Sequence, residues 1–266
     1  MDKKIAFISE VYQDSEFSTG GEKLNYLLLK GLVQNGYRVD IFTNKIVKNS
    51  TNLPDKIYRL EDLPARREDY LLILSGNAVI PSDITYIHGH SYPFRIKMMS
   101  NRFLHLIYKI ISNKSHQKRL AEYNKIRQNI CKTRKVIVSS RILKEDMIKN
   151  YGVKPEQIEI IAPPYEKFDI NKQKNEIFTF GISATGFERK GGYLTLNTIR
   201  KLKNSDKGFK VKIIYPSRNL FVKLLVKLYG IEKYCEFLPV QKDMGNFYNS
   251  IDCLLMPSLI EPFGMV

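Results

Sequence analysis

The sequence contains no tryptophan, few cysteines and no long hydrophobic run. Its three cysteines, Cys131, Cys235 and Cys253, are odd in number and have no paired spacing. This argues against a zinc site and favours a reducing compartment. The apolar run after the N-terminal Met-Asp-Lys-Lys is too short for a signal peptide. No stretch approaches the roughly 18 apolar residues of a membrane span. These absences predict a cytoplasmic location.

The sequence has few acidic residues relative to basic ones. It contains 43 Lys and Arg and 27 Asp and Glu, which give a formal net charge of +16. A field of this sign favours nucleic acid, anionic lipid headgroups or phosphorylated small molecules as partners, and it says nothing about the fold. The 266 residues are enough for one large α/β domain or two modest ones.

The N-terminal third alternates between apolar runs and helical patterns. A glycine pair, Gly20-Gly21, separates a strand from a helix, which predicts a parallel sheet. The pair is a weak phosphate-binding signal, and an ordinary turn is the alternative. The expected elements are strands at 4–11 and 38–43, a helix at 22–37 and a helix at 68–80. Between them, residues 45–62 are expected to be irregular, with a strand near residues 56–60 as the one candidate element.

Two histidines follow the expected strand 83–87. His88 and His90 alternate around Gly89, so both side chains are expected to point the same way. A lone histidine is usually structural, but this pair lies at the carboxyl end of a strand, where open α/β sheets bind ligands. A functional pair and a structural pair stay equally open, and the sequence shows no further metal ligand nearby.

Residues 94–113 carry an apolar stripe at helical spacing, surrounded by positive charge that continues through residues 114–135. A basic amphipathic helix can lie in a membrane interface. The alternative is a helix that packs on the core with a solvated basic face.

A second α/β run follows the proline pair Pro163-Pro164 and the polar stretch 167–176, which read as a linker. Before it, Ser140 is expected to cap a helix that runs to Asn150. The expected elements on either side are strands at 136–139, 158–161, 177–182, 209–215, 235–238 and 253–256, and helices at 192–202, 220–229 and 243–250.

Two loops of the second run suit a phosphorylated sugar. Arg189 and Lys190 lie between glycines directly before a helix, where cations and free N–H groups bind phosphate. Glu261 follows the last strand, and a carboxylate accepts hydrogen bonds from sugar hydroxyls. Gly264 lets the backbone come close to a ligand. Each loop alone could be an ordinary strand-to-helix turn, but together they carry complementary chemistry.

These segments together resemble the GT-B glycosyltransferases of the retaining family 4, which use nucleotide-sugar donors. The resemblance spans nearly the whole chain and implies an α/β fold of two Rossmann-like domains, residues 1–168 on the acceptor side and residues 169–266 on the donor side. It rests on Gly20-Gly21, Asn35-Gly-Tyr-Arg-Val-Asp-Ile-Phe-Thr43, Val136-Ile-Val-Ser-Ser140, Phe180-Gly181 with Arg189-Lys190-Gly191, and Pro257-Ser258 with Glu261-Pro-Phe-Gly-Met265.

The resemblance also implies roles for single residues. The implied catalytic residues are Glu261, which contacts the donor sugar, and His88, which is preferred to His90 on the acceptor side. The implied donor contacts come from glycines, backbone and cations: Gly20, Gly21, Arg189, Lys190, Gly264 and Met265. No metal and no cofactor is expected.

Two departures from the family pattern concern the second domain. Ile182 follows Gly181 where the family often has Arg, so Arg189 is expected to take its place. The family's second Glu and the last strands of its donor domain belong beyond Val266. The second domain is therefore expected to be incomplete.

The sequence thus predicts a retaining glycosyltransferase that moves a sugar from a nucleotide diphosphate sugar to a glycan or lipid-linked acceptor. The expected setting is the inner face of the membrane, where a cytoplasmic protein attaches peripherally to an anionic surface. One alternative is a non-catalytic nucleic-acid-binding protein, although no nucleic-acid motif appears and nucleic acid is not the expected partner. The other is a GT-B epimerase or phosphorylase.

Overall fold

The computed structural model describes residues 3–13, 20–47, 53–99, 113–165, 167, 170–171, 175–204, 208–216, 219–241 and 243–264. The chain forms two compact units, of which the first covers residues 1–165 and 262–265 and the second covers residues 166–261. The predicted domain boundary, between residues 168 and 169, falls outside the described residues.

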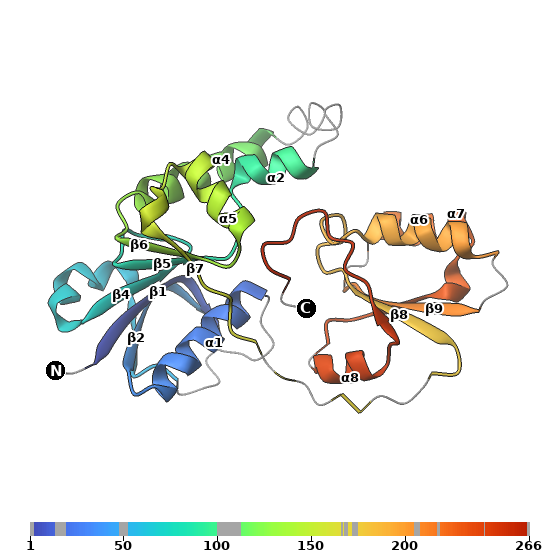
Figure 1. The fold of residues 1–266 in the computed structure, drawn as a ribbon, viewed down its shortest axis with the longest axis horizontal. Helices are drawn as coiled ribbons and strands as arrows, with labels where there is room; N and C mark the ends of the chain where they lie inside the picture. Colours follow the sequence, from blue (N-terminus) through green and yellow to red (C-terminus); the bar gives the residue numbers. More distant parts are fainter. Residues whose placement is uncertain are drawn as a thin grey trace. The chain divides into compact units, whose positions relative to one another are not determined.

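The first unit is built on a seven-stranded sheet in the order β3-β2-β1-β4-β5-β6-β7, and every pair in it is parallel (Figure 1). Its strands are β1 (Lys4–Gln13), β2 (Arg38–Val47), β3 (Lys56–Arg59), β4 (Leu72–Gly76), β5 (Ile84–Ile87), β6 (Lys135–Val138) and β7 (Ile158–Ile160). Its α-helices are α1 (Gly20–Gln34), α2 (Tyr92–Met99), α4 (Asn113–Ile130) and α5 (Arg141–Asp146). Single turns are η1 (Leu60–Asp62), η2 (Pro64–Asp69), η3 (Met147–Tyr151) and η4 (Pro155–Gln157).

The central strand β1 is apolar on both faces because helices and turns cover the sheet on both sides. Ile5 and Phe7 pack with Leu29 of α1, whereas Ala6 and Ile8 pack in a separate cluster on the other face. Parallel strands buried on both faces read as continuous apolar runs, which is how β1 and β2 appear in the sequence. Figure 1 shows α1 below the first sheet and α2, α4 and α5 above it.

The predicted helix at residues 68–80 is wrong. The segment ends the 3₁₀ turn η2 at Asp69 and then forms β4, which pairs in parallel with β1 and with β5. Asn77 and Ala78 follow with positive φ angles of 57° and 51°, which no right-handed helix contains. A short apolar run fits a buried strand and a helix equally well by periodicity, and here pairing in the sheet decided between them.

Other predicted elements of the first unit are corrected in their bounds. Within the irregular stretch 45–62, the strand expected near residues 56–60 is present as β3, and the stretch also contains the end of β2 and the turn η1. Of the predicted helix 94–113, α2 covers the first part, and residues 100–112 lie outside the described part of the chain. Ser140 caps α5 as predicted, but α5 ends at Asp146 and continues as the π-helical turn η3 to Tyr151.

The second unit contains a four-stranded parallel sheet in the order β10-β9-β8-β11. The predicted elements of this unit are all present with small changes of bounds. They are β8 (Phe178–Ser183), α6 (Gly192–Leu202), β9 (Phe209–Ile214), α7 (Leu220–Tyr229), β10 (Cys235–Leu238), α8 (Met244–Asn249) and β11 (Cys253–Leu254). The turn η5 (Glu232–Tyr234), which was not predicted, precedes β10.

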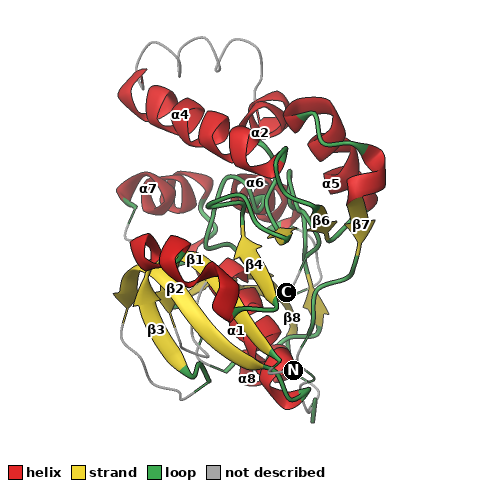
Figure 2. Ribbon diagram, turned by 90° about the vertical axis from the view of Figure 1, so that its left-hand side faces the viewer, coloured by secondary structure: helices red, strands yellow, loops and turns green. Residues whose placement is uncertain are grey.

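Helices cover both faces of this second sheet, with α6 and α7 on one side and α8 on the other, as the two views show (Figures 1 and 2). A Cβ atom on Gly181 of β8 would lie 2.5 Å from a methyl carbon of Ile251, the residue that follows α8. Glycine at this position therefore lets the α8 segment approach the sheet closely, while Leu196 of α6 and Val222 of α7 fill the opposite face.

Candidate active site

A cavity of about 560 Å³ opens in the first unit at the carboxyl ends of β1, β4 and β5. Ser9 comes from β1, Asn77 follows β4, and His88 follows β5. In the sheet, β2 and β3 lie on one side of β1, and β4 to β7 lie on its other side. The strand order therefore reverses between β1 and β4. Open α/β sheets bind ligands at such a switch point.

His88 lies in this cavity against the start of α1. A Cβ atom on Gly21 would lie 2.5 Å from His88 Nε2, so the second glycine of the pair leaves room for the ring. Asn77 Nδ2 lies 3.2 Å from the same nitrogen. His88 Nδ1 is buried and has no hydrogen-bond partner among the described residues. Burial lowers the pKa of His88 below its ordinary value of 6.5, so the imidazole is neutral near neutral pH.

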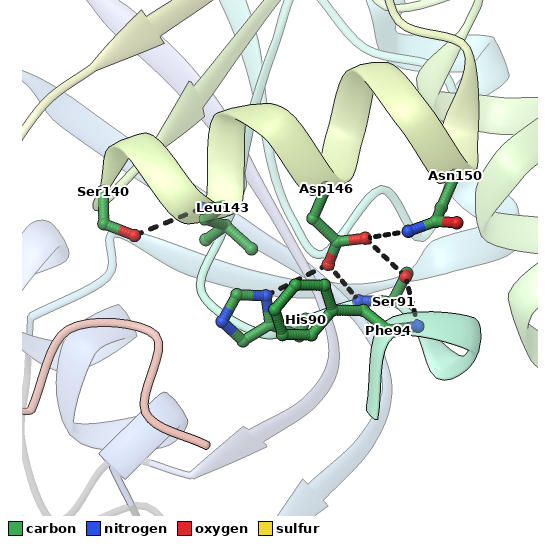
Figure 3. A network of polar contacts seen from close by, with 7 residues as sticks. All are labelled: His90, Ser91, Phe94, Ser140, Leu143, Asp146 and Asn150. Carbon is green, nitrogen blue, oxygen red and sulfur yellow. Dashed lines mark hydrogen bonds and ion pairs between the residues drawn. The ribbon is translucent and has the colours of Figure 1, made fainter. Parts of the chain in front are cut away.

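His90 lines the same cavity but is held by a polar network around Asp146 of α5 (Figure 3). Asp146 accepts from His90 Nδ1 at 3.1 Å and from the Ser91 backbone N–H at 2.7 Å. It also accepts from the Ser91 hydroxyl and from the Asn150 amide, at 2.5 and 2.6 Å. One face of the His90 ring stacks on the ring of Phe94, with the two ring centroids 4.1 Å apart. His90 is therefore held by Asp146 and Phe94, whereas His88 Nδ1 has no partner in the described part of the chain.

Burial alone would raise the pKa of Asp146, but the hydrogen bonds from His90, Ser91 and Asn150 outweigh it and hold the pKa below its usual value. Asp146 thus stays ionised and orients the His90 ring.

In the second unit, the structure brings the predicted cations and the predicted carboxylate together. Lys190 Nζ donates to Glu261 Oε2, and Arg189 Nη1 lies 3.8 Å from the same oxygen. Ser258 Oγ lies 3.4 Å from it. Lys190 is only 9% exposed, so this ammonium group depends on Glu261 for its partner. The loop after β8 and the turn after β11 meet because β8 and β11 are neighbours in a parallel sheet.

Hydrogen bonds join the loop after β8 to the turn after β11. Leu259 N donates to the carbonyl of Arg189 at 2.9 Å, and Arg189 Nη1 donates to the carbonyl of Ile260 at 3.2 Å. Gly191 has a φ of 76°, and a Cβ atom there would lie 2.1 Å from the carbonyl oxygen of Pro257. Only glycine meets both conditions.

The sequence led us to expect free backbone N–H donors directly before α6. The structure shows instead that three of these groups are already paired, those of Lys190, Gly191 and Gly192. They donate to carbonyls within the loop, at 2.8, 3.1 and 2.7 Å. The side chains of Arg189 and Lys190, and not these three N–H groups, are the groups that an anion would meet.

The remaining predicted donor contacts are glycines and backbone. Gly20 begins α1, and Gly264 has a φ of 82°, the left-handed region that a glycine turn requires. Met265 lies outside the described residues.

Sequence reasoning missed two residues next to the histidines. Asn77 was hidden because its segment was predicted to be helical. Asp146 lies inside a predicted helix between two core residues, Leu143 and Met147, which are both fully buried. An acid at a core-facing position needs buried partners, and this is the one signal that could have marked it.

The described residues contain no helix that is both long enough and apolar enough to cross a membrane. Within the same ranges, no group of three or more His, Cys, Asp or Glu side chains is arranged to hold a metal ion.

Comparison with known proteins gives one family and several structures. The model of the family described as Glycosyltransferase Family 4 matches residues 18–166, more than half of the chain. WaaG, a glycosyltransferase involved in lipopolysaccharide biosynthesis, superposes with a TM-score of 0.72 at 14% sequence identity, over 96% of this chain and 75% of WaaG. No curated protein matches the sequence.

Two further solved structures are similar. A glycosyltransferase from Rickettsia africae ESF-5 has a TM-score of 0.60 at 13% identity, over 96% of this chain and 73% of its own. The lipopolysaccharide outer core galactosyltransferase WaaB has a TM-score of 0.57 at 14% identity, over 98% of this chain and 76% of its own. Identities this low establish the fold alone.

Proposed function

This chain belongs to glycosyltransferase family 4 and has the GT-B fold, and from this premise we propose that it transfers a sugar from a nucleotide diphosphate sugar with retention of configuration. The proposed acceptor is a glycan or a lipid-linked glycan at an anionic membrane surface. The observation that carries the proposal is the contact of Lys190 with Glu261 in the second unit.

Lys190 and Glu261 have the chemistry that the two ends of such a donor require. The ammonium group and the neighbouring Arg189 guanidinium would stabilise the charge that develops on the leaving diphosphate. The carboxylate would accept hydrogen bonds from hydroxyls of the transferred sugar. In the structure each group is the partner of the other, and Lys190 is nearly buried. A bound donor would replace this ion pair with one contact for each group.

The cavity of the first unit supports a polyhydroxyl acceptor. Its lining combines hydroxyl, amide and imidazole groups from Ser9, Asn25, Asn77 and His88. Neutral His88, with Nδ1 free of partners among the described residues, would hold a hydroxyl of the sugar or of the acceptor. Gly20 and Gly21 would let backbone approach the donor phosphates, with Gly264 and Met265 as further backbone contacts.

Positive charge on the first unit supports the anionic membrane surface. The helix α4 carries exposed Lys118, Arg119, Lys125 and Arg127. Clustered basic residues attract anionic lipids over about a Debye length. A protein held in this way would act peripherally on the inner face of the membrane.

The test is to replace Lys190 and Glu261 separately by alanine. Uridine, guanosine and adenosine diphosphate sugars are first screened by thermal shift to find the donor. Each substitution is then expected to lower transfer from that donor by about a hundredfold to a thousandfold, the usual effect of losing one preorganised charge-stabilising group. Circular dichroism checks that both variants keep the fold.

A matched control is the exposed ion pair of Lys135 with Glu159, 3.6 Å apart in the first unit. Alanine at either position is expected to leave transfer unchanged. Near wild-type transfer by both the Lys190 and the Glu261 variant would refute the donor site. A radiolabelled donor that yields an epimer, or a sugar phosphate, would refute the transfer reaction instead.

A further inference from the structure

The helix α7 of the second unit has apolar residues on two sides, of which only one faces the core. Val222 and Val226 are buried against the sheet, with exposed fractions of 2% and 6%. Leu220, Phe221, Leu224 and Leu228 lie on the outer side, with exposed fractions of 79%, 56%, 53% and 69%. These four residues are called the α7 stripe.

The α7 stripe is continuous, and both ends of the helix are fixed. Leu220, Leu224 and Leu228 follow at intervals of four residues, which places them one above the other on a single face. Asn219 Oδ1 caps the start by accepting from the Phe221 N–H at 2.9 Å, and Gly230 ends the helix with a φ of 59°. The stripe is thus held in place by a packed core, and each of its three leucines is more than half exposed.

Aromatic surface extends the stripe onto the next helix. The ring of Phe221 lies 6.3 Å from the ring of Tyr193 on α6, and Tyr193 is 38% exposed. Figure 1 shows α6 and α7 side by side on the same face of the second sheet. Leu194 of α6 is 53% exposed. Apolar patches of this kind mark interaction surfaces, and Tyr suits a boundary between apolar and wet surroundings.

The charge next to the stripe identifies the kind of partner. Lys223 and Lys227 are exposed on α7 beside the leucines, and α7 contains no acidic residue. An apolar face bordered by lysines is the pattern of helices that lie in the interface of anionic bilayers. In a symmetric dimer the same patch would meet its copy and bring like charges together. The lysines therefore favour an anionic lipid surface over a second copy of the chain.

We propose that the α7 stripe inserts into the interface of an anionic membrane, with Lys223 and Lys227 contacting the lipid headgroups. This deepens the proposed function and rests on it for its purpose, because a lipid-linked acceptor would be reached by a protein whose second unit is itself held at the bilayer. The contact is separate from the basic helix α4 of the first unit, which is polar on its exposed side.

The experiment measures flotation of the full chain with vesicles of phosphatidylcholine alone and of phosphatidylcholine mixed with phosphatidylglycerol, without any donor. Leu224→Gln with Leu228→Gln is expected to weaken binding to the mixed vesicles by at least about tenfold, since two exposed leucines lose their burial in the interface. Lys223→Gln with Lys227→Gln is expected to weaken it about fivefold for each charge removed.

Matched controls remove equivalent groups elsewhere. Leu71 and Ile142 of the first unit are 60% and 56% exposed, and Leu71→Gln with Ile142→Gln is expected to leave binding unchanged. The exposed Lys210 serves in the same way for the charge variants. Circular dichroism of each variant shows that a loss of binding is not a loss of fold.

Three results would overturn the proposal. The first is unchanged vesicle binding by the leucine variant. The second is loss of binding only when Lys118 and Lys125 of α4 are replaced. The third is a wild-type oligomer in analytical ultracentrifugation that the leucine variant converts to a monomer while vesicle binding stays the same. Donor binding is measured separately by thermal shift, so a failure of the proposed function leaves the vesicle result readable.

Discussion

Gly21 lies close enough to the His88 ring for its missing side chain to matter. We expect Gly21→Ala to displace the imidazole, because the added Cβ would lie 2.5 Å from Nε2. A displacement of about 1 Å in a positioning group can cost on the order of a hundredfold in rate, and we expect a loss of that size in sugar transfer. Steady-state kinetics with varied acceptor measure it.

Gly31 gives the matched control, because it lies in the same helix with nothing within 4 Å of its added Cβ. Gly31→Ala is expected to keep the transfer rate and to add up to about 1 kcal/mol to the free energy of unfolding through helix propensity. Equal rates for the two variants would contradict the expectation that the position of the His88 ring matters for transfer.

His88 also predicts how stability depends on pH. Burial lowers the pKa of His88 in the folded chain below the 6.5 of the unfolded chain. As the pH falls through 6.5, the unfolded chain takes up a proton that the folded chain does not, so the free energy of unfolding falls. The slope from this one group cannot exceed about 1.4 kcal/mol per pH unit.

Urea denaturation at about pH 7.5 and about pH 5.5 brackets the ordinary histidine pKa and measures the effect. His88→Asn is expected to reduce the difference between the two values, and His116→Asn, outside the cavity lining, serves as the control. If the free energy of unfolding still differs as much between the two pH values in the His88 variant, the effect does not come from the lowered pKa of His88.

At the scale of elements, neighbouring serines at the start of α5 make opposite contributions. Ser140 Oγ accepts from the Leu143 N–H at 3.3 Å and caps the helix. Ser139 Oγ is buried and has no hydrogen-bond partner among the described residues. Ser140→Ala is expected to lower the free energy of unfolding by about 1 kcal/mol. Ser139→Ala is expected to leave it unchanged or raise it slightly, since an unpaired hydroxyl is removed. Equal losses in denaturant titrations of the two variants would contradict this account.

Elements with a clear hydrophobic period and with glycines at their ends were predictable from the sequence. The helix α6 has the predicted bounds 192–202, and Gly36, Gly152 and Gly230 end helices with positive φ angles. Strand β4 was not predictable, because its short apolar run has no alternation and its strand character comes from pairing with β1 and β5.

The meeting of the loop at Lys190 with the turn at Glu261 was predictable for a different reason. Both segments follow strands of one parallel sheet, and the carboxyl ends of neighbouring parallel strands share an edge. The Asp146 network was not predictable, because it joins α5 to Ser91 and His90. These residues precede Asp146 by 55 and 56 positions in the sequence. No local pattern reports a contact of that separation.

At the scale of the whole molecule, the connection between the two units should be the first site of proteolysis. Residues 161–165, 167, 170–171 and 175 have no helix or strand, and Tyr165 is 78% exposed. Each unit has its own sheet and core, so cleavage between them breaks neither. Limited chymotrypsin digestion is expected to cut after Tyr165 and release two stable fragments.

Tyr165→Ser is expected to slow this first cut several-fold, whereas Tyr37→Ser, at a half-buried position between α1 and β2, should leave it unchanged. Mass spectrometry of the fragments identifies the site. A first cut within either sheet would contradict the division into two units.

The partner of Lys190 is supplied by a residue 71 positions later in the chain. During synthesis at about 5 to 20 residues per second, the lysine waits on the order of several seconds for Glu261 to leave the ribosome. The first unit has its last strand complete at Ile160, long before this moment. A nascent polypeptide can therefore complete the strands of the first sheet before Lys190 meets Glu261. Termination before Glu261 is expected to leave the first sheet intact and Lys190 without this partner.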